Sequence, residues 1–297
     1  MNRSARTAGL LAASALLLAG CGGGDEAEVS APSAEPSAGP SAAAAGGDCS
    51  PESLETLEEG TLTIGTDSPA FEPWFSDDDP TNGQGFESAV AYAVAEQLGY
   101  AQDDVTWTVA AFNSIISPAE KPFDLAINQV SITDERRQAV DFTSGYYTAA
   151  QTVITVAGSP IDGATTLADL KGAKLGAQVG TTSLQAIEDV VQPDEEPGVF
   201  DTNDVAKTQL QNGQVDGIVV DLPTAFYITA AELDDGVIVG QLPATDGAEQ
   251  EEFGIVLDKD SPLTDCATQA VDALREDGTL AKLEEEYLAG AGAPVLE

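Results

Sequence analysis

The sequence predicts an α/β protein. Between residues 61 and 130, short segments that alternate as strands take turns with segments of helical period, an order typical of a parallel sheet covered by helices. A second series of the same kind starts at residue 151 and continues to about residue 241. The chain has 297 residues, which allows one or two domains of this type.

In the first half of the chain, alternation predicts strands and a 3.6-residue period predicts helices. The predicted strands are 61–66, 105–109 and 123–130; the predicted helices are a short one within 51–59, one at 86–98 and a patch at 113–120. Pro51 suits the first helical position, and Gly99 stops the second helix. Residues 142–147 are predicted to form a loop that ends in two tyrosines.

The same two patterns organise the second half. The predicted strands are 151–156, 174–178, 215–220, 237–241 and 253–257; the predicted helices are 167–172, 184–191, 204–212, 223–231, 262–276 and 279–289. A glycine stop at Gly172 ends the first of these helices. Strands that alternate with helices in this way again favour a parallel sheet.

The chain is strongly acidic. It has 51 Asp and Glu residues against 11 Lys and Arg residues, a formal net charge of −40, and no histidine. This charge excludes nucleic-acid binding through phosphate neutralisation and predicts repulsion from anionic lipid head groups. The absence of histidine excludes Ser-His-Asp catalysis and His-ligated metal sites, so we expect no metal and no other cofactor.

Residues 1–20 have the pattern of a bacterial lipoprotein signal peptide. Arg3 and Arg6 precede an apolar run that is too short for a permanent membrane span. Residues 18–21 then resemble the lipobox, whose cysteine is lipidated, for example with palmitate, and becomes the new N-terminus. We expect Cys21 to anchor the protein to the extracellular face of the cell membrane; an ordinary secretory signal with a chance cysteine is the alternative.

Residues 21–48 consist mainly of Gly, Ala, Ser, Pro and acidic residues without hydrophobic periodicity, so we expect a disordered tether. Beyond it, Cys49 and Cys266 lie near the two ends of the part predicted to fold. An even pair of cysteines in an exported protein predicts a disulfide. Two free, buried thiols are the alternative.

Arg136 is the residue that most suggests a binding site. It follows the polar exit of strand 123–130, in the first turn of a short helix for which Thr133 is a candidate N-cap. The helix dipole disfavours a cation there, and a residue placed against a local rule often has a functional reason. After residue 20, the only other arginines are Arg137 and Arg275. We expect Arg136 to bind an anionic group with Ser131 beside it and Arg137 to be a solvated charge, which is also the alternative for Arg136.

Two further strand exits carry polar residues. A turn of glycine and hydroxyl residues, Gly180-Thr181-Thr182, opens the helix at 184–191; it either offers backbone N–H groups to an anion or caps an ordinary helix. Strand 215–220 ends at Asp221, which either places a carboxylate at the mouth of a cleft or caps the helix that follows. The residues alone do not separate these alternatives.

An aromatic loop follows the first strand and its terminal residue, Asp67. The loop is rich in proline and carries three rings within five positions: Phe71, Trp74 and Phe75. We expect Phe75 to anchor the loop in the core. Phe71 and Trp74 fit either a core anchor or the wall of a binding site.

Short blocks of this sequence resemble family 3 of the bacterial extracellular solute-binding proteins, the amino-acid receptors of ABC importers. They are, in order, Gly65-Thr66-Asp67, Gly85-Phe86-Glu87, Phe123-Asp124, Ser131-Ile132-Thr133 followed by Arg136, Asp141-Phe142-Thr143, Gly180-Thr181-Thr182, Val215-Asp216 and Asp277-Gly278-Thr279. The resemblance covers residues 50–290. It implies a two-lobed, type II periplasmic-binding-protein-like fold in which each lobe is a mixed sheet flanked by helices.

The implied first lobe comprises residues 49–148 and 253–297, and the second comprises residues 149–252, with a two-stranded hinge between them. The resemblance implies that the ligand, a free amino acid, binds between the lobes. It implies a receptor rather than an enzyme, with the transmembrane permease of an importer as its partner. We expect a monomer that touches the membrane only through its lipid anchor.

The resemblance also assigns site residues. Ser131 and Arg136 would bind the ligand carboxylate, the Gly180-Thr181-Thr182 turn would complete that site through Thr182, and Asp221 would bind the α-ammonium. This chemistry is sound, because a zwitterion needs a forked cation for its carboxylate and a carboxylate for its ammonium.

Other residues would surround the ligand side chain. Phe71 would cover the ligand, but the loop is one residue longer than usual and Trp74 is the alternative. Asp67 reaches a cationic side chain in family members that bind lysine or arginine. Asn128 and Gln129 stand where small hydroxyl residues are common in the family, which suggests a polar ligand side chain.

Two alternative functions remain open from the sequence. One is a receptor for another small carboxylate, such as an opine or a short peptide, which would not need Asp221. The other is a dehydratase-type enzyme on the same fold, which would need an acid or base in the cleft. The candidates for that role are Asp67, Glu72, Glu87 and Asp221.

Overall fold

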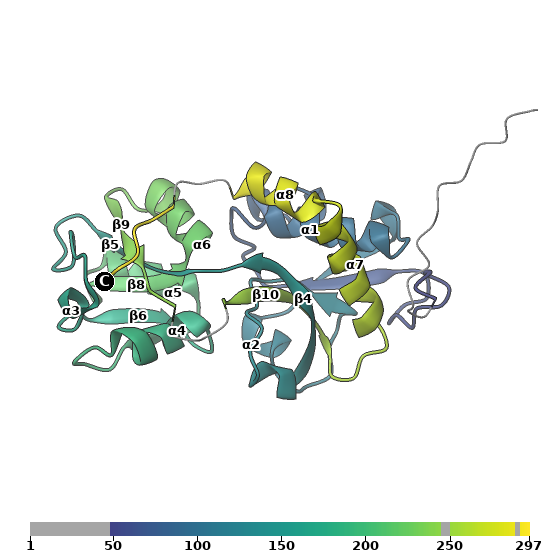
Figure 1. Cartoon of the computed structure of the whole chain (residues 1–297), viewed down its shortest axis with the longest axis horizontal. Helices are drawn as coiled ribbons and strands as arrows, with labels where there is room; N and C mark the ends of the chain where they lie inside the picture. Colours follow the sequence, from purple (N-terminus) through teal and green to yellow (C-terminus); the bar gives the residue numbers. More distant parts are fainter. Residues whose placement is uncertain (1–47, 245–249, 289–291) are drawn as a thin grey trace, which may run out of the picture. The chain divides into compact units, whose positions relative to one another are not determined.

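The computed structural model describes residues 48–244, 250–288 and 292–297, which form two lobes, each built on a five-stranded sheet. This is the two-lobed α/β architecture that the resemblance implies (Figure 1). Residues 1–47, which include the predicted signal peptide, Cys21 and almost all of the tether, lie outside the described residues.

The first lobe has the strand order β2-β1-β3-β10-β4. Its strands are β1 (Leu62–Thr66), β2 (Val105–Val109), β3 (Leu125–Ala126), β4 (Val140–Thr148) and β10 (Glu252–Asp258). The strands β1, β2 and β3 are parallel, whereas β10 runs antiparallel to both β3 and β4. The sheet is therefore mixed, and the late strand β10 closes it.

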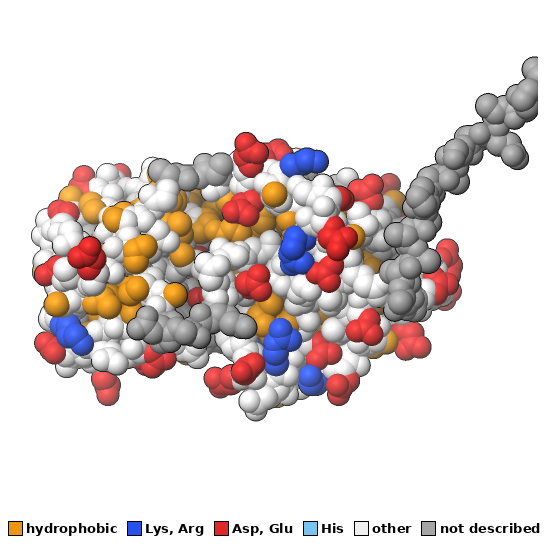
Figure 2. Space-filling view, viewed as in Figure 1, with side chains coloured by type: hydrophobic (Ala, Val, Ile, Leu, Met, Phe, Trp, Pro, Cys, Tyr) orange, Lys and Arg blue, Asp and Glu red, His pale blue; other side chains and the backbone are white. Residues whose placement is uncertain are grey.

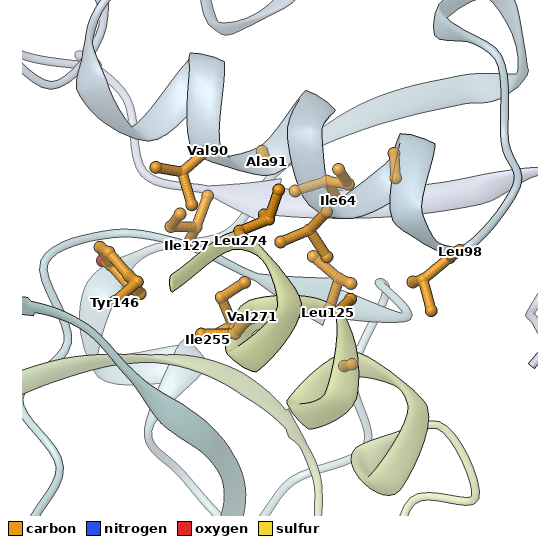
Figure 3. Close-up of a cluster of buried hydrophobic side chains, with 14 of the residues drawn as sticks. Ile64, Val90, Ala91, Leu98, Leu125, Ile127, Tyr146, Ile255, Val271 and Leu274 are labelled. Carbon is orange, nitrogen blue, oxygen red and sulfur yellow. The ribbon is translucent and has the colours of Figure 1, made fainter. Parts of the chain in front are cut away.

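The helices of the first lobe cover this sheet. They are α1 (Phe86–Gln97), α2 (Phe112–Ile115), α7 (Thr264–Glu276) and α8 (Thr279–Tyr287), with 3₁₀ turns η1 (Ser76–Asp78), η2 (Pro80–Asn82), η3 (Gln102–Asp104) and η4 (Arg136–Gln138). Side chains from α1, α7 and the sheet form one apolar core, in which Val90, Val271 and Ile64 are fully buried (Figure 3). Fully burying one such side chain contributes roughly 1.5–3 kcal/mol to folding.

The second lobe has the strand order β7-β6-β8-β5-β9. Its strands are β5 (Gln151–Val156), β6 (Leu175–Gln178), β7 (Gly198–Phe200), β8 (Gly217–Asp221) and β9 (Gly236–Gln241). Its helices are α3 (Leu167–Leu170), α4 (Thr182–Ala186), α5 (Asn203–Gln211) and α6 (Leu222–Tyr227), with π-helical turns η5 (Ile187–Val191) and η6 (Ile228–Glu232). Here β6 is parallel to β7 and β8, and β5 is antiparallel to β8 and β9.

The chain passes between the lobes after β4 and again before β10. At this point the N–H of Ala149 donates to the carbonyl oxygen of Glu251 at 2.8 Å, and the N–H of Leu222 donates to that of Ala150 at 3.0 Å. The two passing segments are therefore hydrogen-bonded to each other and to the second lobe. Each lobe also has apolar clusters of its own. We therefore expect the lobes to move relative to each other by bending at the two passing segments, which form the hinge.

Residues 292–297 correct the expected lobe boundary, because they lie on the second lobe rather than the first. Val295 forms a parallel bridge with Gln241 in β9, and Leu296 is buried in the apolar cluster of the second lobe. The N–H of Leu167 in turn donates to the carbonyl oxygen of Glu297 at 2.9 Å. The burial of the Leu296 side chain in the second lobe explains why the end of the chain crosses back to that lobe.

Several elements differ from the sequence prediction, which also lacked the strand β7. Residues 142–147, predicted as a loop, belong to β4, whose side chains are mostly buried and whose backbone pairs with β10. Sequence periodicity misses this strand because it is buried on both sides and contains Gly145. Residues 51–59 form turns rather than a helix, and β3 is only two residues long.

Acidic residues dominate the surface. Figure 2 shows many Asp and Glu side chains and few Lys and Arg side chains on the face that it draws. Among the described residues, no helix has the length and apolar character needed to cross a membrane.

The predicted disulfide between Cys49 and Cys266 is confirmed, with a Cα–Cα distance of 5.6 Å and a sequence separation of 217 residues. It joins the start of the folded part to α7. Because a bridge of this span restricts the unfolded chain, replacing both cysteines with serine should lower the free energy of unfolding by about 2–5 kcal/mol. Urea denaturation of the double variant and the parent would measure this; equal midpoints would contradict it.

Candidate ligand-binding site

One cavity of about 50 Å³ brings together residues from both lobes. Its lining consists of Asp67, Pro69, Phe71, Phe112, Asn128, Gln129, Ser131, Arg136, Gln178, Thr181, Thr182, Ser183, Asn203 and Asp221. Several of these residues follow the carboxyl ends of β1, β3, β6 and β8, which is where open α/β sheets place ligands. All predicted ligand-binding residues except Trp74 and Gly180 line this cavity.

Arg136 is buried, with 8% of its surface exposed, so a solvated surface charge is excluded. The side chain of Thr133 accepts a hydrogen bond from the Arg136 backbone N–H at 3.1 Å and supports the turn. The guanidinium donates to the carbonyl oxygens of Ser131 (2.6 Å) and Gly180 (2.9 Å), and its carbon lies 5.4 Å from the centre of the Phe112 ring. Of its five N–H donors, three have no acceptor in the described part of the chain.

This guanidinium also joins the two lobes, because Ser131 belongs to the first and Gly180 to the second. Burial lowers the pKa of Arg136, whereas the carboxylates of Glu251 and Asp221 favour its charged form. Its immediate partners are carbonyl oxygens rather than a carboxylate. The group is thus held in place without being neutralised by a direct ion pair.

The turn before α4 contributes Thr181, Thr182 and Ser183 to the lining of the same cavity. Gly180 has a φ of +76°, a conformation that favours glycine, and a Cβ atom there would lie 2.6 Å from Asn113 Oδ1 of the first lobe. Thr181 caps the helix by accepting from the N–H of Leu184 at 3.2 Å. The N–H groups of Thr182 and Ser183 lie in the first helical turn, where no acceptor exists within the helix. The turn therefore caps the helix, and its role toward an anion stays a prediction.

Asp221 lies at the N-cap position of α6, but its side chain makes no capping hydrogen bond. Instead its Oδ1 accepts from the side-chain amide of Gln151 at 3.1 Å. Removal from water, followed by repulsion from Glu251, raises the pKa of Asp221 to about 8. A carboxyl group with so high a pKa lacks a cation, and a ligand ammonium would supply one.

Asp67 and two rings form another part of the lining. Asp67 is oriented by backbone donors, since its Oδ2 accepts from the N–H of Phe112 at 3.0 Å and its Oδ1 from that of Ser68 at 2.7 Å. Phe71 and Phe112 both line the cavity. Of the two candidates for the covering ring, only Phe71 is therefore placed to contact a ligand.

The prediction that Trp74 contacts the ligand requires correction. Its ring is fully buried and packs edge-on against Phe86, Tyr147 and Phe253. Its Nε1 donates to the hydroxyl of Thr224 in the second lobe at 2.9 Å. Phe75 is buried in the core as expected.

Glu87 supports the cavity wall from behind. It is fully buried and accepts from the backbone N–H of Gln129 at 2.6 Å, from the side-chain amide of Gln129 and from the hydroxyl of Tyr146. Gln129 has a φ of +47°, an uncommon conformation for a residue with a side chain. Burial raises the pKa of Glu87 to about 7. Glu87, considered from the sequence as a cleft acid, instead holds Gln129 in place.

Five residues that line the cavity were not predicted from the sequence: Pro69, Phe112, Gln178, Ser183 and Asn203. Gln178 and Ser183 flank the Gly-Thr-Thr turn, so their positions in the sequence could have indicated them. Phe112 and Asn203 lie at the starts of two helices, and only the fold brings them to this site.

This chain is similar to known proteins whose names state amino-acid binding. A 30% identical relative over 234 residues, covering 76% of this chain and 84% of its own, is a probable histidine-binding protein of Campylobacter jejuni. An ancestral arginine-binding protein is similar in structure: its arginine complex has 33% identity and a TM-score of 0.63, with 77% of this chain and 99% of the other covered. An ancestral arginine-binding protein bound to glutamine is also similar, with 31% identity and a TM-score of 0.64; 78% of this chain and 100% of the other chain are covered.

The family assignment follows from a match along most of the chain. Residues 62–290 match the model of the bacterial extracellular solute-binding proteins, family 3. This segment includes both sheets and every residue of the cavity lining. The chain belongs to the family 3 bacterial extracellular solute-binding proteins.

Proposed function

We propose that this protein captures a free, polar amino acid between its two lobes and delivers it to the membrane permease of an ABC importer. One observation carries the proposal. Arg136 from the first lobe and Asp221 from the second, which have opposite charges when ionised, line the same cavity.

The cavity has separate groups for the two ends of a zwitterion. Three guanidinium N–H donors of Arg136 and the first-turn N–H groups of α4 suit a carboxylate. Asp221 suits the α-ammonium. Because these groups come from different lobes, a bound amino acid would bridge the lobes and stabilise their approach, which is the state that a permease would recognise.

The charge of the lining favours a neutral polar or cationic side chain over an acidic one. Among the described residues, the ionisable side chains of the lining are Asp67, Arg136 and Asp221. Arg136 is assigned to the ligand carboxylate, so no cation remains for an acidic side chain. Asp67, which lines the cavity together with Asn128 and Gln129, offers a partner to a cationic group. The histidine- and arginine-binding relatives are consistent with this preference.

The proposal includes a lipid anchor. The lipobox-like residues 18–21 and the following tether would keep the receptor, as a monomer, at the extracellular face of the membrane. The acidic surface would be repelled by anionic lipids, so contact with the membrane would rest on Cys21.

Thermal unfolding in the presence of each of the twenty amino acids would test ligand capture. Ligand at roughly 100 times its Kd adds about 2.7 kcal/mol to stability, which should raise Tm by several degrees. We expect polar or cationic amino acids to raise Tm and glutamate to leave it unchanged. The absence of any shift, in folded protein free of carried-over ligand, would overturn the proposal.

Arg136→Lys keeps the charge but loses the planar fork, and it should raise Kd by about 10–100-fold. Arg137→Lys is the matched control, because Arg137 is exposed next in sequence. Isothermal titration would compare the two variants. Equal affinities would show that Arg136 does not bind the carboxylate. Asp221→Ala should abolish binding of an amino acid, whereas a receptor for a carboxylate without an ammonium would retain its ligand.

Binding should depend on pH through Asp221. The ammonium needs the ionised carboxyl group, whose pKa is about 8 without ligand, so Kd should rise up to about tenfold per pH unit as pH falls from 8 to 6. Binding at pH 7 should release a proton, which titrations in buffers of different ionisation enthalpy would detect. Asp221→Asn should remove this release, and the exposed Asp234→Asn should not.

The same carboxyl group should affect the stability of the ligand-free protein. Its pKa is higher in the folded state than in the unfolded chain, so the folded state holds the proton more tightly and stability falls as pH rises from about 4 to about 8. Glu87 adds a similar slope between about 4.5 and 7. At pH 8, Asp221→Asn should therefore be more stable than the parent, on the order of 2 kcal/mol by urea denaturation; an equal or lower stability would contradict this pKa.

A further inference from the structure

Glu251 is a carboxylate outside the cavity that contacts both lobes at the hinge. Its Oε1 accepts hydrogen bonds from the hydroxyl of Ser131 in the first lobe and from that of Thr182 in the second, each at 2.5 Å. The two hydroxyl oxygens lie 3.1 Å from each other. One carboxylate oxygen therefore gathers a side chain from each lobe.

The amide of Gln151 links Glu251 to Asp221. Gln151 is buried and begins β5, directly after the first passing segment. Its Nε2 lies 3.1 Å from Glu251 Oε2 and 3.1 Å from Asp221 Oδ1, so its two hydrogens can serve the two carboxylates. Its Oε1 accepts from the hydroxyl of Ser183 at 2.6 Å, which fixes the orientation of the amide.

These contacts form a continuous network from Ser131 through Glu251 and Gln151 to Asp221. Its two central members lie where the chain passes between the lobes. Gln151 directly follows the first passing segment, and Glu251 is the last residue of the second. Its ends are residues of the cavity lining, whereas Glu251 does not line the cavity. The network connects the site proposed for the ligand carboxylate with the site proposed for its ammonium.

We infer that Glu251 is a positioning residue that stabilises the approach of the two lobes and sets the ligand-binding groups in place without touching the ligand. The role in ligand binding rests on the proposed function, whereas the role in lobe approach does not. A charged acceptor is needed because hydrogen bonds to an ionised group are about twice as strong as neutral ones. Glutamine at this position would lose the charge and turn an amide N–H₂ toward groups that themselves donate.

The test measures lobe separation and affinity in Glu251→Gln, in the mature chain with its disulfide intact. Spin labels at two exposed positions, Val109 in β2 and Val199 in β7, report the distance between the lobes. We expect the ligand-free variant to show a longer or broader distance distribution than the parent. For the ligand identified by thermal unfolding, we expect Kd to rise by about tenfold or more.

Glu252→Gln is the matched control, because it makes the same change at the next residue, which is exposed. It should leave both measurements unchanged. Glu251→Asp retains the charge and should give an intermediate affinity, which also covers the case in which Glu251→Gln fails to fold. Distances and affinities in Glu251→Gln and Glu251→Asp that equal those of Glu252→Gln would overturn the inference.

The two proposals fail separately in this design. If no amino acid binds, the proposed function fails, but the distance distribution of the ligand-free protein still decides whether Glu251 stabilises lobe approach. If ligand binds equally well to all variants and their distances agree, the role of Glu251 fails and the proposed function stands.

Discussion

The structure depends on a buried cation that has no carboxylate in direct contact. Burying a charge is costly unless hydrogen bonds and nearby opposite charges compensate for it. Arg136 receives two carbonyl oxygens, one from each lobe, and the face of the Phe112 ring. The remaining compensation comes at longer range, chiefly from the carboxylate of Glu251. This arrangement keeps the guanidinium rigid while leaving part of it for a ligand.

The carboxyl groups around Arg136 and the cavity have different roles. Asp67 is held by backbone N–H groups at the cavity wall, and Glu87 is fully buried behind Gln129. Asp221 faces the cavity with a raised pKa, and Glu251 lies outside it at the hinge. In a chain with so many acidic residues, composition alone would not distinguish these from the solvated ones. Their hydrogen-bond partners do.

Much of the fold follows from the sequence, because hydrophobic periodicity and glycine stops identify α1, α7 and most strands. The strand β4 escapes this reasoning, since its mostly buried side chains and its glycine hide the alternation. Of the predicted site residues, Arg136 was indicated by its position after a strand exit, whereas Asp221 was assigned only through the family resemblance, because a carboxylate there can also cap a helix. Trp74 could not be assigned, because a ring in a loop looks the same whether it packs inward or outward, and only tertiary contacts decide. Gln151 and Glu251 gave no sequence signal, because their roles arise from the way the two passing segments meet.

The last residues of the chain have a consequence for following the motion of this protein. Because residues 292–297 pair with β9 and bury Leu296 in the second lobe, the end of the chain moves with that lobe although α8 belongs to the first. A fluorescent protein fused after residue 297 would therefore be carried by the second lobe. With a dye on α1, movement at the hinge would change the energy transfer between the two reporters. The helix order alone would have placed both reporters on the first lobe, where no such change is expected.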